Sequence, residues 1–158
     1  MSHPEFVDLA DIDAEDLLAL LNEAFLRKHL VDHARFDKDS VREWVKEKRR
    51  LNALPGCRVR AIRVDGRLAG WCGIQPDDQR FELAIVLSRR AWGLGIAVFK
   101  VLMGWAREFG HEEVVFHLLD SRPEYRSLAR MAHKVHGSEL SGRRFTTYRL
   151  AVERPVAT

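Results

Sequence analysis

Apolar residues recur along this chain with two periods, and each period predicts a different kind of element. Between residues 96 and 109 the large apolar side chains follow an i, i+3, i+4, i+7 spacing, which predicts an amphipathic helix with Ile96 on its inner face, and Gly110 is a typical residue to end it. Residues 81–87 form an almost continuous apolar run rich in large and β-branched side chains, which is typical of a buried strand. The turn between them contains Gly93 and Gly95.

The same patterns predict the other elements. Helices are expected over residues 13–25, 40–50 and 127–135, the first capped by Asp11 or Asp13 and the second by Asp39 or Ser40. The third should turn Met131 and Val135 inward and end at Gly137. Strands are expected over residues 6–9, 57–64, 68–75, 113–119 and 145–150. The order is β-α-α-β-β-β-α-β-α-β, and because no repeat or linker interrupts it, residues 1–158 are predicted to be one α/β (α+β) domain.

The two cysteines lie on either side of a predicted hairpin. Asp65-Gly66 is a typical two-residue hairpin turn, which would place Val64 opposite Arg67 and, in a continuous register, Val59 opposite Cys72. Cys57 and Cys72 would then be diagonal neighbours, farther apart than a disulfide normally allows, so we expect both thiols to be reduced and buried.

Composition limits the kind of protein. The 158 residues are 46% hydrophobic and 31% charged, enough for one core in a soluble protein. No apolar run is long enough for a transmembrane helix, and the first residues lack the basic-then-apolar pattern of a signal peptide, so we expect a cytoplasmic protein without membrane contact. The net charge of +3 suits a polyanionic cofactor. The basic run 46–50 is expected to be a solvated helix end rather than a nucleic-acid site. His29 and His33 have metal-ligand spacing but no third ligand, so no metal is expected.

The glycine turn between strand and helix is the strongest candidate binding site. Such a turn leaves the first N–H groups of the helix unpaired at the positive end of its dipole, where phosphate binds. The dinucleotide fingerprint is excluded because Val98 stands where Gly or Ala is required, and the Gly-Lys-Ser/Thr of the Walker loop is absent. Arg90-x-x-Gly93-x-Gly95 does resemble the Q/R-x-x-G-x-G/A pattern of the GNAT (Gcn5-related N-acetyltransferase) superfamily, and the element order agrees. A tight βα turn in another α/β domain is the alternative.

The GNAT resemblance implies a mixed central sheet of six or seven strands with about four helices, and acetyl-CoA as co-substrate. The turn would grip the pyrophosphate of the cofactor through Arg90, Ala91, Trp92, Gly93, Leu94, Gly95, Ile96 and Ala97. A Cβ at either glycine would block close approach and disfavour a positive φ. The strand before it would pair with the pantetheine arm through the backbone of Ile85, Val86 and Leu87, and the N–H groups of Ile85 and Leu87 would also donate to the thioester oxygen. For Trp92, an aromatic side chain that only covers the start of the helix is an alternative of equal weight to cofactor contact.

The resemblance also suggests a general acid. In many GNAT enzymes a Tyr on the last helix protonates the departing thiolate, within the pattern N-x-x-A-x-x-x-Y-x-x-x-G. The matching residues here are Arg126, Ala129, His133 and Gly137, so Arg replaces Asn and His replaces Tyr. His133 is therefore our first candidate acid and Tyr125 the second, with a packed or solvated His133 as the alternative.

The candidate base is Glu82, the one carboxylate inside the central predicted strand. Alternation puts it on the face of Ala84 and Val86, opposite Leu83 and Ile85. From there it could accept an ammonium proton through water, although a solvated strand end is the alternative.

The resulting hypothesis is an N-acetyltransferase that moves an acetyl group from acetyl-CoA to a primary amine by direct attack in a ternary complex. The acceptor, a small amine or a protein or peptide amine, would be chosen by residues 29–37 and 76–79, whose carboxylates favour a cation. Two alternatives remain: a CoA-binding module without turnover, because the Asn and Tyr are replaced, and a nucleic-acid-directed module. A homodimer stays open.

Overall fold

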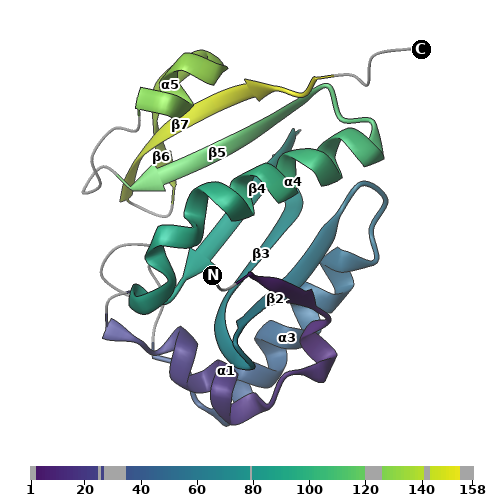
Figure 1. Cartoon of the computed structure of the whole chain (residues 1–158), viewed down its shortest axis with the longest axis vertical. Helices are drawn as coiled ribbons and strands as arrows, with labels where there is room; N and C mark the ends of the chain where they lie inside the picture. Colours follow the sequence, from purple (N-terminus) through teal and green to yellow (C-terminus); the bar gives the residue numbers. More distant parts are fainter. Residues whose placement is uncertain are drawn as a thin grey trace.

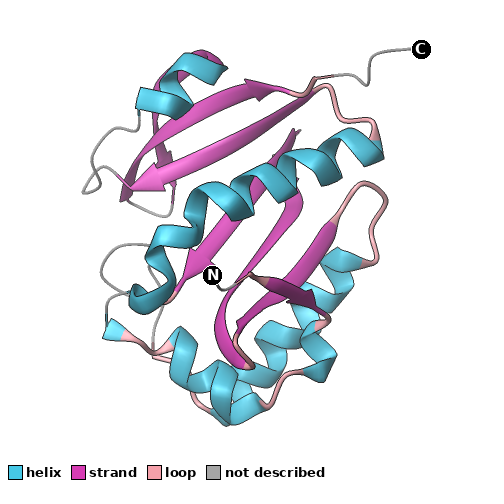
Figure 2. Cartoon of the chain, viewed as in Figure 1, coloured by secondary structure: helices cyan, strands magenta, loops and turns pink. Residues whose placement is uncertain are grey.

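The computed structural model describes residues 3–24, 26, 35–78, 80–119, 126–140 and 143–153. Within them, seven strands form one mixed sheet in the order β1-β2-β3-β4-β5-β7-β6 (Figures 1 and 2). The strands are β1 (Glu5–Val7), β2 (Arg58–Val64), β3 (Arg67–Asp77), β4 (Arg80–Leu87), β5 (Glu113–Leu119), β6 (Ala132–Leu140) and β7 (Arg143–Ala151). The helices are α1 (Ala14–Leu21), α3 (Lys38–Asn52), α4 (Gly95–Phe109) and α5 (Arg126–Met131), and the short 3₁₀ segments are η1 (Leu9–Asp11) and η2 (Arg89–Leu94). This is the predicted GNAT-like mixed α/β fold.

Helix boundaries follow local capping chemistry. Asp13 caps α1 as predicted, accepting a bond from the Glu15 N–H. The second helix begins earlier than predicted, because Asp37 and Ser40 form a reciprocal capping box and Ser40 lies inside the helix as the residue that completes it. Gly110, at a φ of 79°, ends α4 in the left-handed conformation that glycine favours.

The sheet separates two hydrophobic cores. One core joins α4 to one face of the sheet through Val98, Phe99, Leu102 and Ala106, together with Leu83 and Leu87 of β4. The other joins α1 and α3 to the opposite face and includes Val86 of β4. Strand β4 thus alternates between the two cores as its sequence predicts. Ile96 is the exception, because it lies outside the buried arc of α4 and is 64% exposed.

The end of the chain differs from the prediction. The expected helix over residues 127–135 stops at Met131, and the chain continues as β6 from Ala132 through Gly137 to Leu140. Because β6 pairs antiparallel with β7 along its length, ladder hydrogen bonds override the weak helical pattern. Met131 and Val135, which were expected to be inward, are 52% and 41% exposed.

The β2–β3 hairpin contains a bulge that the sequence does not reveal. Val64 does pair with Arg67, but the register shifts between Ile62 and Arg63, and Cys72 therefore faces Arg60 instead of Val59. Cys57 and Cys72 are buried free thiols, as predicted, and burial raises the pKa of both.

Two glycine substitutions should have opposite effects on stability. A Cβ at Gly70 would collide with the carbonyl oxygen of Val86 on β4, so Gly70→Ala should destabilise the fold by about 1–3 kcal/mol or more. A Cβ at Gly104, inside α4, would meet no atom within 4 Å. Gly104→Ala should therefore stabilise by about 0.5–1 kcal/mol, because alanine favours the helix. Urea unfolding measures both, and equal effects would contradict the close β3–β4 approach.

Candidate active site

The central feature of the site is the parting of β4 from β5. These parallel strands are paired at a single position in the described structure, Glu82 with Val115, whereas β3 pairs with β4 from Gly70 and Leu87 down to Asp77 and Arg80. Figure 1 shows α4 crossing in front of β4 and running alongside β5. Beyond Glu82 the β5-facing edge of β4 is thus free of strand pairing. Backbone groups there can receive an extended ligand.

The predicted cofactor residues of β4 lie along this free edge. Val86 and Leu87 are buried in opposite cores, and Ile85 is half-buried against the α4 core. Their side chains therefore serve packing, as predicted, and only their backbone groups are left for the proposed ligand.

The glycine turn adopts a different backbone from the one expected. Residues 89–94 form η2, and Gly95 begins α4 with a φ of −54°, so neither Gly93 nor Gly95 needs a positive φ. A Cβ at either position would instead point into space with no protein atom within 4 Å. The N-cap residue of α4, Leu94, makes no side-chain capping bond, and the first turn of the helix holds no acidic residue. The Gly95 N–H donates to the Trp92 carbonyl, and no side-chain cap or acidic residue competes with an anion for the rest of the first turn.

The arginines of the turn are tied to neighbouring elements. Exposed Arg90 donates from its guanidinium to the Leu68 carbonyl at 2.9 Å, and the Arg89 N–H donates to the Glu23 carboxylate at 3.0 Å. Ala91 is buried and Trp92 half-buried, and Ile96 and Ala97 are exposed at the start of α4. Arg90 therefore braces the turn against the β2–β3 hairpin.

An open cavity of about 850 Å³ adjoins the turn on the α1 side. Its lining includes Arg67, Arg89, Arg90, Asp16 and Glu23 and does not reach Glu82. The cavity borders the first residues of the predicted phosphate turn, away from the β4–β5 parting.

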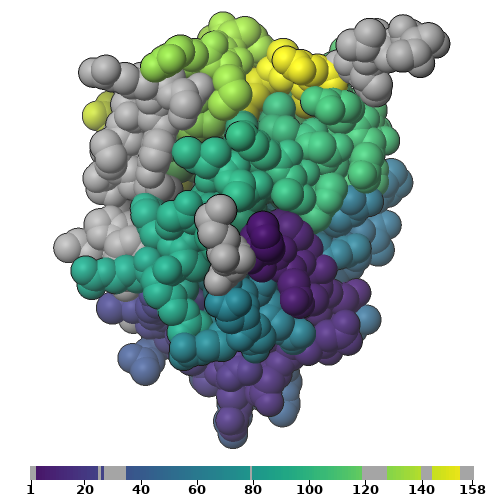
Figure 3. Space-filling view, viewed as in Figure 1, coloured from purple at the N-terminus to yellow at the C-terminus, as the bar shows by residue number. Residues whose placement is uncertain are grey.

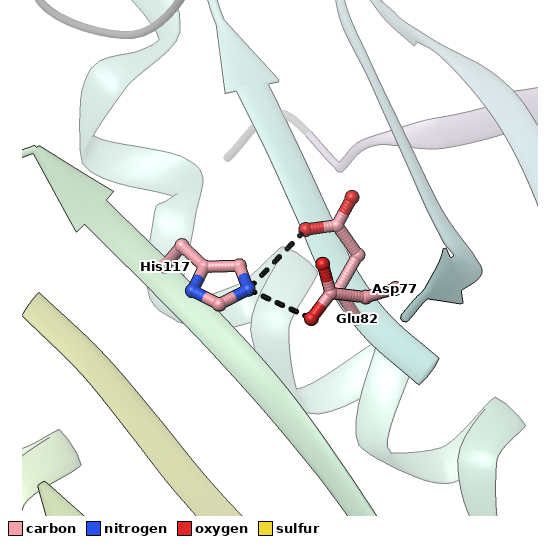
Figure 4. Close-up of side chains that lie close together, drawn as sticks. All are labelled: Asp77, Glu82 and His117. Atoms are coloured by element: carbon pink, nitrogen blue, oxygen red, sulfur yellow. Dashed lines mark hydrogen bonds and ion pairs between the residues drawn. The ribbon is translucent and has the colours of Figure 1, made fainter. Parts of the chain in front are cut away.

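Glu82 belongs to a polar cluster with Asp77 and His117 (Figure 4), on the sheet face that packs against α3. Its Oε1 accepts a bond from Gln75 Nε2 at 2.6 Å, and its Oε2 lies 3.8 Å from His117 Nε2. Burial raises the pKa of Glu82, and Asp77 adds to this, whereas the Gln75 bond and the charges of His117 and Lys48 oppose it. Glu82 is therefore a largely buried carboxyl group with a raised pKa, and the alternative of a solvated residue at the strand end is not what the structure shows.

The sequence analysis did not identify His117 as a functional residue. The predicted strand 113–119 turns Val114, Phe116 and Leu118 toward the α4 core, so His117 points to the opposite face. There its Nε2 lies 3.1 Å from Asp77 Oδ2, and its Nδ1 lies 2.7 Å from Thr147 Oγ1. The available signal was an ionisable side chain in the apolar interior of a strand whose other ionisable residue, Glu113, stands at its start.

Asp77 and two hydroxyl groups complete the cluster. Asp77, expected in a loop, is the last residue of β3 and faces His117. Thr147, which is buried, lies 2.7 Å from Ser138 Oγ on β6. A chain of polar contacts thus crosses the sheet from Glu82 to Ser138.

Lys48 approaches the same cluster from α3. Its Nζ donates to Gln75 Oε1 at 2.8 Å and lies 4.4 Å from the centre of the Trp71 ring. Burial lowers the pKa of Lys48, while the Glu82 carboxylate opposes this shift. Gln75 therefore connects the ammonium group to the carboxylate.

The two candidate acids have different outcomes. His133 is on strand β6 instead of a helix, is 46% exposed, and pairs with Glu113 at 2.8 Å. Burial raises the pKa of Glu113. The hydrogen bonds and charges of Arg149 and His133 outweigh this effect and hold the pKa of Glu113 below its usual range. Tyr125 and residues 29–34 and 79 lie outside the described residues. His133 as acid remains a prediction.

One group of side chains in the described ranges is arranged closely enough to share a cation. The ligand atoms of Asp77, Glu82 and His117 all lie within 4.8 Å of one another.

Among the residues that the structure describes, no helix is both long and apolar enough to cross a membrane.

Comparison with known proteins identifies the family. A family model for the acetyltransferase (GNAT) domain matches residues 5–130. The chain therefore belongs to the GNAT acetyltransferase family and is an acyltransferase, as its glycine turn predicted.

Solved structures agree with this fold at low identity. An N-acetyltransferase from Staphylococcus aureus Mu50 is 16% identical, with a TM-score of 0.71 over 97% of this chain and 99% of that one. The YncA protein of Salmonella typhimurium, solved with its cofactor acetyl-CoA, is 17% identical, with a TM-score of 0.65 over 100% and 98%. RimL, a ribosomal L7/L12 α-N-protein acetyltransferase in complex with coenzyme A, is 16% identical, with a TM-score of 0.71 over 96% of each chain. No curated protein matches the chain in sequence.

The Glu82→Gln variant should change how stability depends on pH. Because burial raises the pKa of Glu82, the folded state binds its proton more tightly than the unfolded chain, and wild-type stability falls as pH rises above the unfolded value of 4.5. Between about pH 4.5 and pH 8, the unfolding free energy of Glu82→Gln should therefore increase relative to that of the wild type as pH rises. Exposed Glu43, changed to Gln, is the control. A pH-independent difference at position 82 would contradict the raised pKa.

Proposed function

We propose that this chain transfers an acetyl group from acetyl-CoA to a primary amine by direct attack in a ternary complex. One observation carries the proposal: the start of α4, which has no side-chain cap and no acidic residue in its first turn, is joined through the short η2 segment to the β4 edge that β5 leaves unpaired. A diphosphate and an extended amide-bearing arm need these two features in succession. The acetyl-CoA and coenzyme A bound by YncA and RimL support the same cofactor here.

The chemistry then divides among backbone and side chains. The amine nitrogen attacks the thioester carbon, a C–N bond forms, and the oxyanion is stabilised by N–H groups of the free β4 edge. The C–S bond breaks and the thiolate takes a proton from an acid, for which His133 and Tyr125 are the candidates. Glu82 is the proposed base, supported by its buried carboxyl beside the parting of the strands.

Asp77 and Glu82 favour a cationic acceptor, because two carboxylates close to one site attract an ammonium group. The proposed acceptor is therefore a primary amine that arrives protonated, on a small molecule, peptide or protein. RimL, named for a protein α-amine, supports the last class.

Cofactor affinity tests the glycine turn. Gly95→Val should weaken CoA binding at least tenfold, about 1.4 kcal/mol, because its branched side chain would fill the space in front of the helix start. Isothermal titration with CoA measures this, with Gly104→Ala on the same helix as the control and urea unfolding as the check on folding. Equal affinities would contradict the assignment.

Turnover separates the enzyme from a binding module. Thiol release from acetyl-CoA across a panel of amines should show turnover by wild type, and Glu82→Gln should lower kcat/KM by about 10²–10⁴ if it removes a general base. His133→Ala and Tyr125→Phe are assayed in the same way. The variant whose kcat falls identifies the general acid. CoA binding without thiol release for any amine would favour the module without turnover.

A further inference from the structure

We propose that Asp77, Glu82 and His117 form a binding site for a divalent transition-metal ion such as Zn²⁺. The ligand atoms are Asp77 Oδ2, Glu82 Oε2 and His117 Nε2, which come from β3, β4 and β5 and lie close together (Figure 4). The inference goes beyond the proposed function, because metal binding is measured on the protein alone and requires neither acetyl-CoA nor an amine.

The spacing of the three ligand atoms matches what one small ion requires. His117 Nε2 lies 3.1 Å from Asp77 Oδ2 and 3.8 Å from Glu82 Oε2, and one ligand atom from each side chain lies within 4.8 Å of the other two. Tetrahedral Zn²⁺ with nitrogen and oxygen ligands at about 2.0–2.2 Å holds those ligands about 3.3–3.5 Å from one another. An ion between the three side chains therefore requires only small side-chain rotations.

Side chains outside the ligand set hold two of the ligands in place. Gln75 Nε2 donates to Glu82 Oε1 at 2.6 Å, so Oε2 is the oxygen that faces His117. On the other side, His117 Nδ1 lies 2.7 Å from the hydroxyl of Thr147, a buried residue on the neighbouring strand β7. Hydrogen bonds to the far atoms of ligating carboxylates and imidazoles orient the ligands of protein metal sites. The proposed site has such bonds on both kinds of ligand.

The Thr147 hydroxyl is compatible with both the metal-free and the metal-bound imidazole. Without metal, His117 Nε2–H donates to the acceptor-only carboxylate of Asp77, and the Thr147 hydroxyl donates to Nδ1. Metal binding needs the lone pair of Nε2, so the ring hydrogen moves to Nδ1 and donates to Thr147. The Thr147 hydroxyl then donates to Ser138 Oγ, 2.7 Å away. The neutral ring therefore binds the ion by a change of tautomer, with no net loss of a proton.

Charge and ligand type favour a transition-metal ion. The Asp77 and Glu82 side chains are each 22% exposed, which leaves a path from solvent but places two carboxylates close together in a largely buried position. A divalent cation between them offsets their mutual repulsion. The imidazole favours Zn²⁺ and similar ions over Ca²⁺ and Mg²⁺, which prefer oxygen ligands. The ammonium group of Lys48 is bonded to Gln75 Oε1, so it does not occupy the proposed ligand atoms.

The first experiment measures zinc affinity on chelator-treated protein without an affinity tag, by competition with a fluorescent zinc indicator. Asp77→Asn, Glu82→Gln and His117→Gln should each weaken the tightest site by about tenfold or more, because each removes a ligand, and Thr147→Val should weaken it by about tenfold. Asp78→Asn is the matched control, because Asp78 is the exposed neighbouring carboxylate and its φ of 49° suits asparagine. An affinity unchanged in all three ligand variants overturns the inference.

The second experiment uses wild-type protein and so does not depend on how the variants fold. Nitrogen NMR of the imidazole should show the His117 hydrogen on Nε2 in chelator and on Nδ1 after one equivalent of Zn²⁺, with the Nε2 resonance shifted. Mg²⁺ in excess should leave the His117 resonances unchanged. Zinc that is taken up without changing these resonances is bound elsewhere, and this result overturns the inference.

The third experiment separates the metal site from the proposed function. In the zinc-loaded protein the Glu82 carboxylate is a ligand and cannot accept a proton, so zinc should slow acetyl transfer and chelator should restore it. A protein that binds zinc at this site but acetylates no amine contradicts the proposed function and supports the metal site. A protein that acetylates amines but shows no zinc binding at His117 supports the function and overturns the metal site.

Discussion

The site depends on the single pairing position between β4 and β5. Parallel strands that stayed paired would use every backbone group of β4 on both edges, and an extended cofactor would have no place to bind. Because the ladder is confined to Glu82 and Val115, the two strands remain in one sheet, while the β5-facing edge of β4 from Leu83 to Leu87 has no strand partner. The candidate base therefore lies where the sheet opens, beside the β4 edge proposed for the thioester.

The two faces of β4 perform different tasks. Toward α4, Leu83 and Leu87 build the larger core and fix the helix whose start forms the proposed phosphate site. Toward α3, the strand carries Glu82, which meets Gln75, Lys48 and His117 from three other elements. A strand period of two thus places the core behind the proposed phosphate site on one face of β4 and the proposed base on the other.

The sequence predicted what local chemistry determines. The position of the turn between strand and helix, most of the α4 stripe and the alternation of β4 were predicted correctly, because each depends on residues close together in the chain, whereas the 3₁₀ backbone of the turn and the exposure of Ile96 were not. The His117 cluster was not, since its members come from β3, β4, β5 and β7 and meet only through strand pairing. The helix expected at His133 failed for a related reason: pairing with β7 outweighed a short and weakly periodic pattern.

The two buried cysteines affect how the protein behaves toward sulfur chemistry. Cys57 and Cys72 are the only cysteines in the chain, both are shielded from solvent, and burial keeps both as poor nucleophiles. A sulfhydryl-trapping dye added to the folded protein would therefore report the sulfur liberated from the cofactor with little background from the polypeptide. The same shielding should make the fold tolerant of mild oxidants that inactivate proteins with surface thiolates.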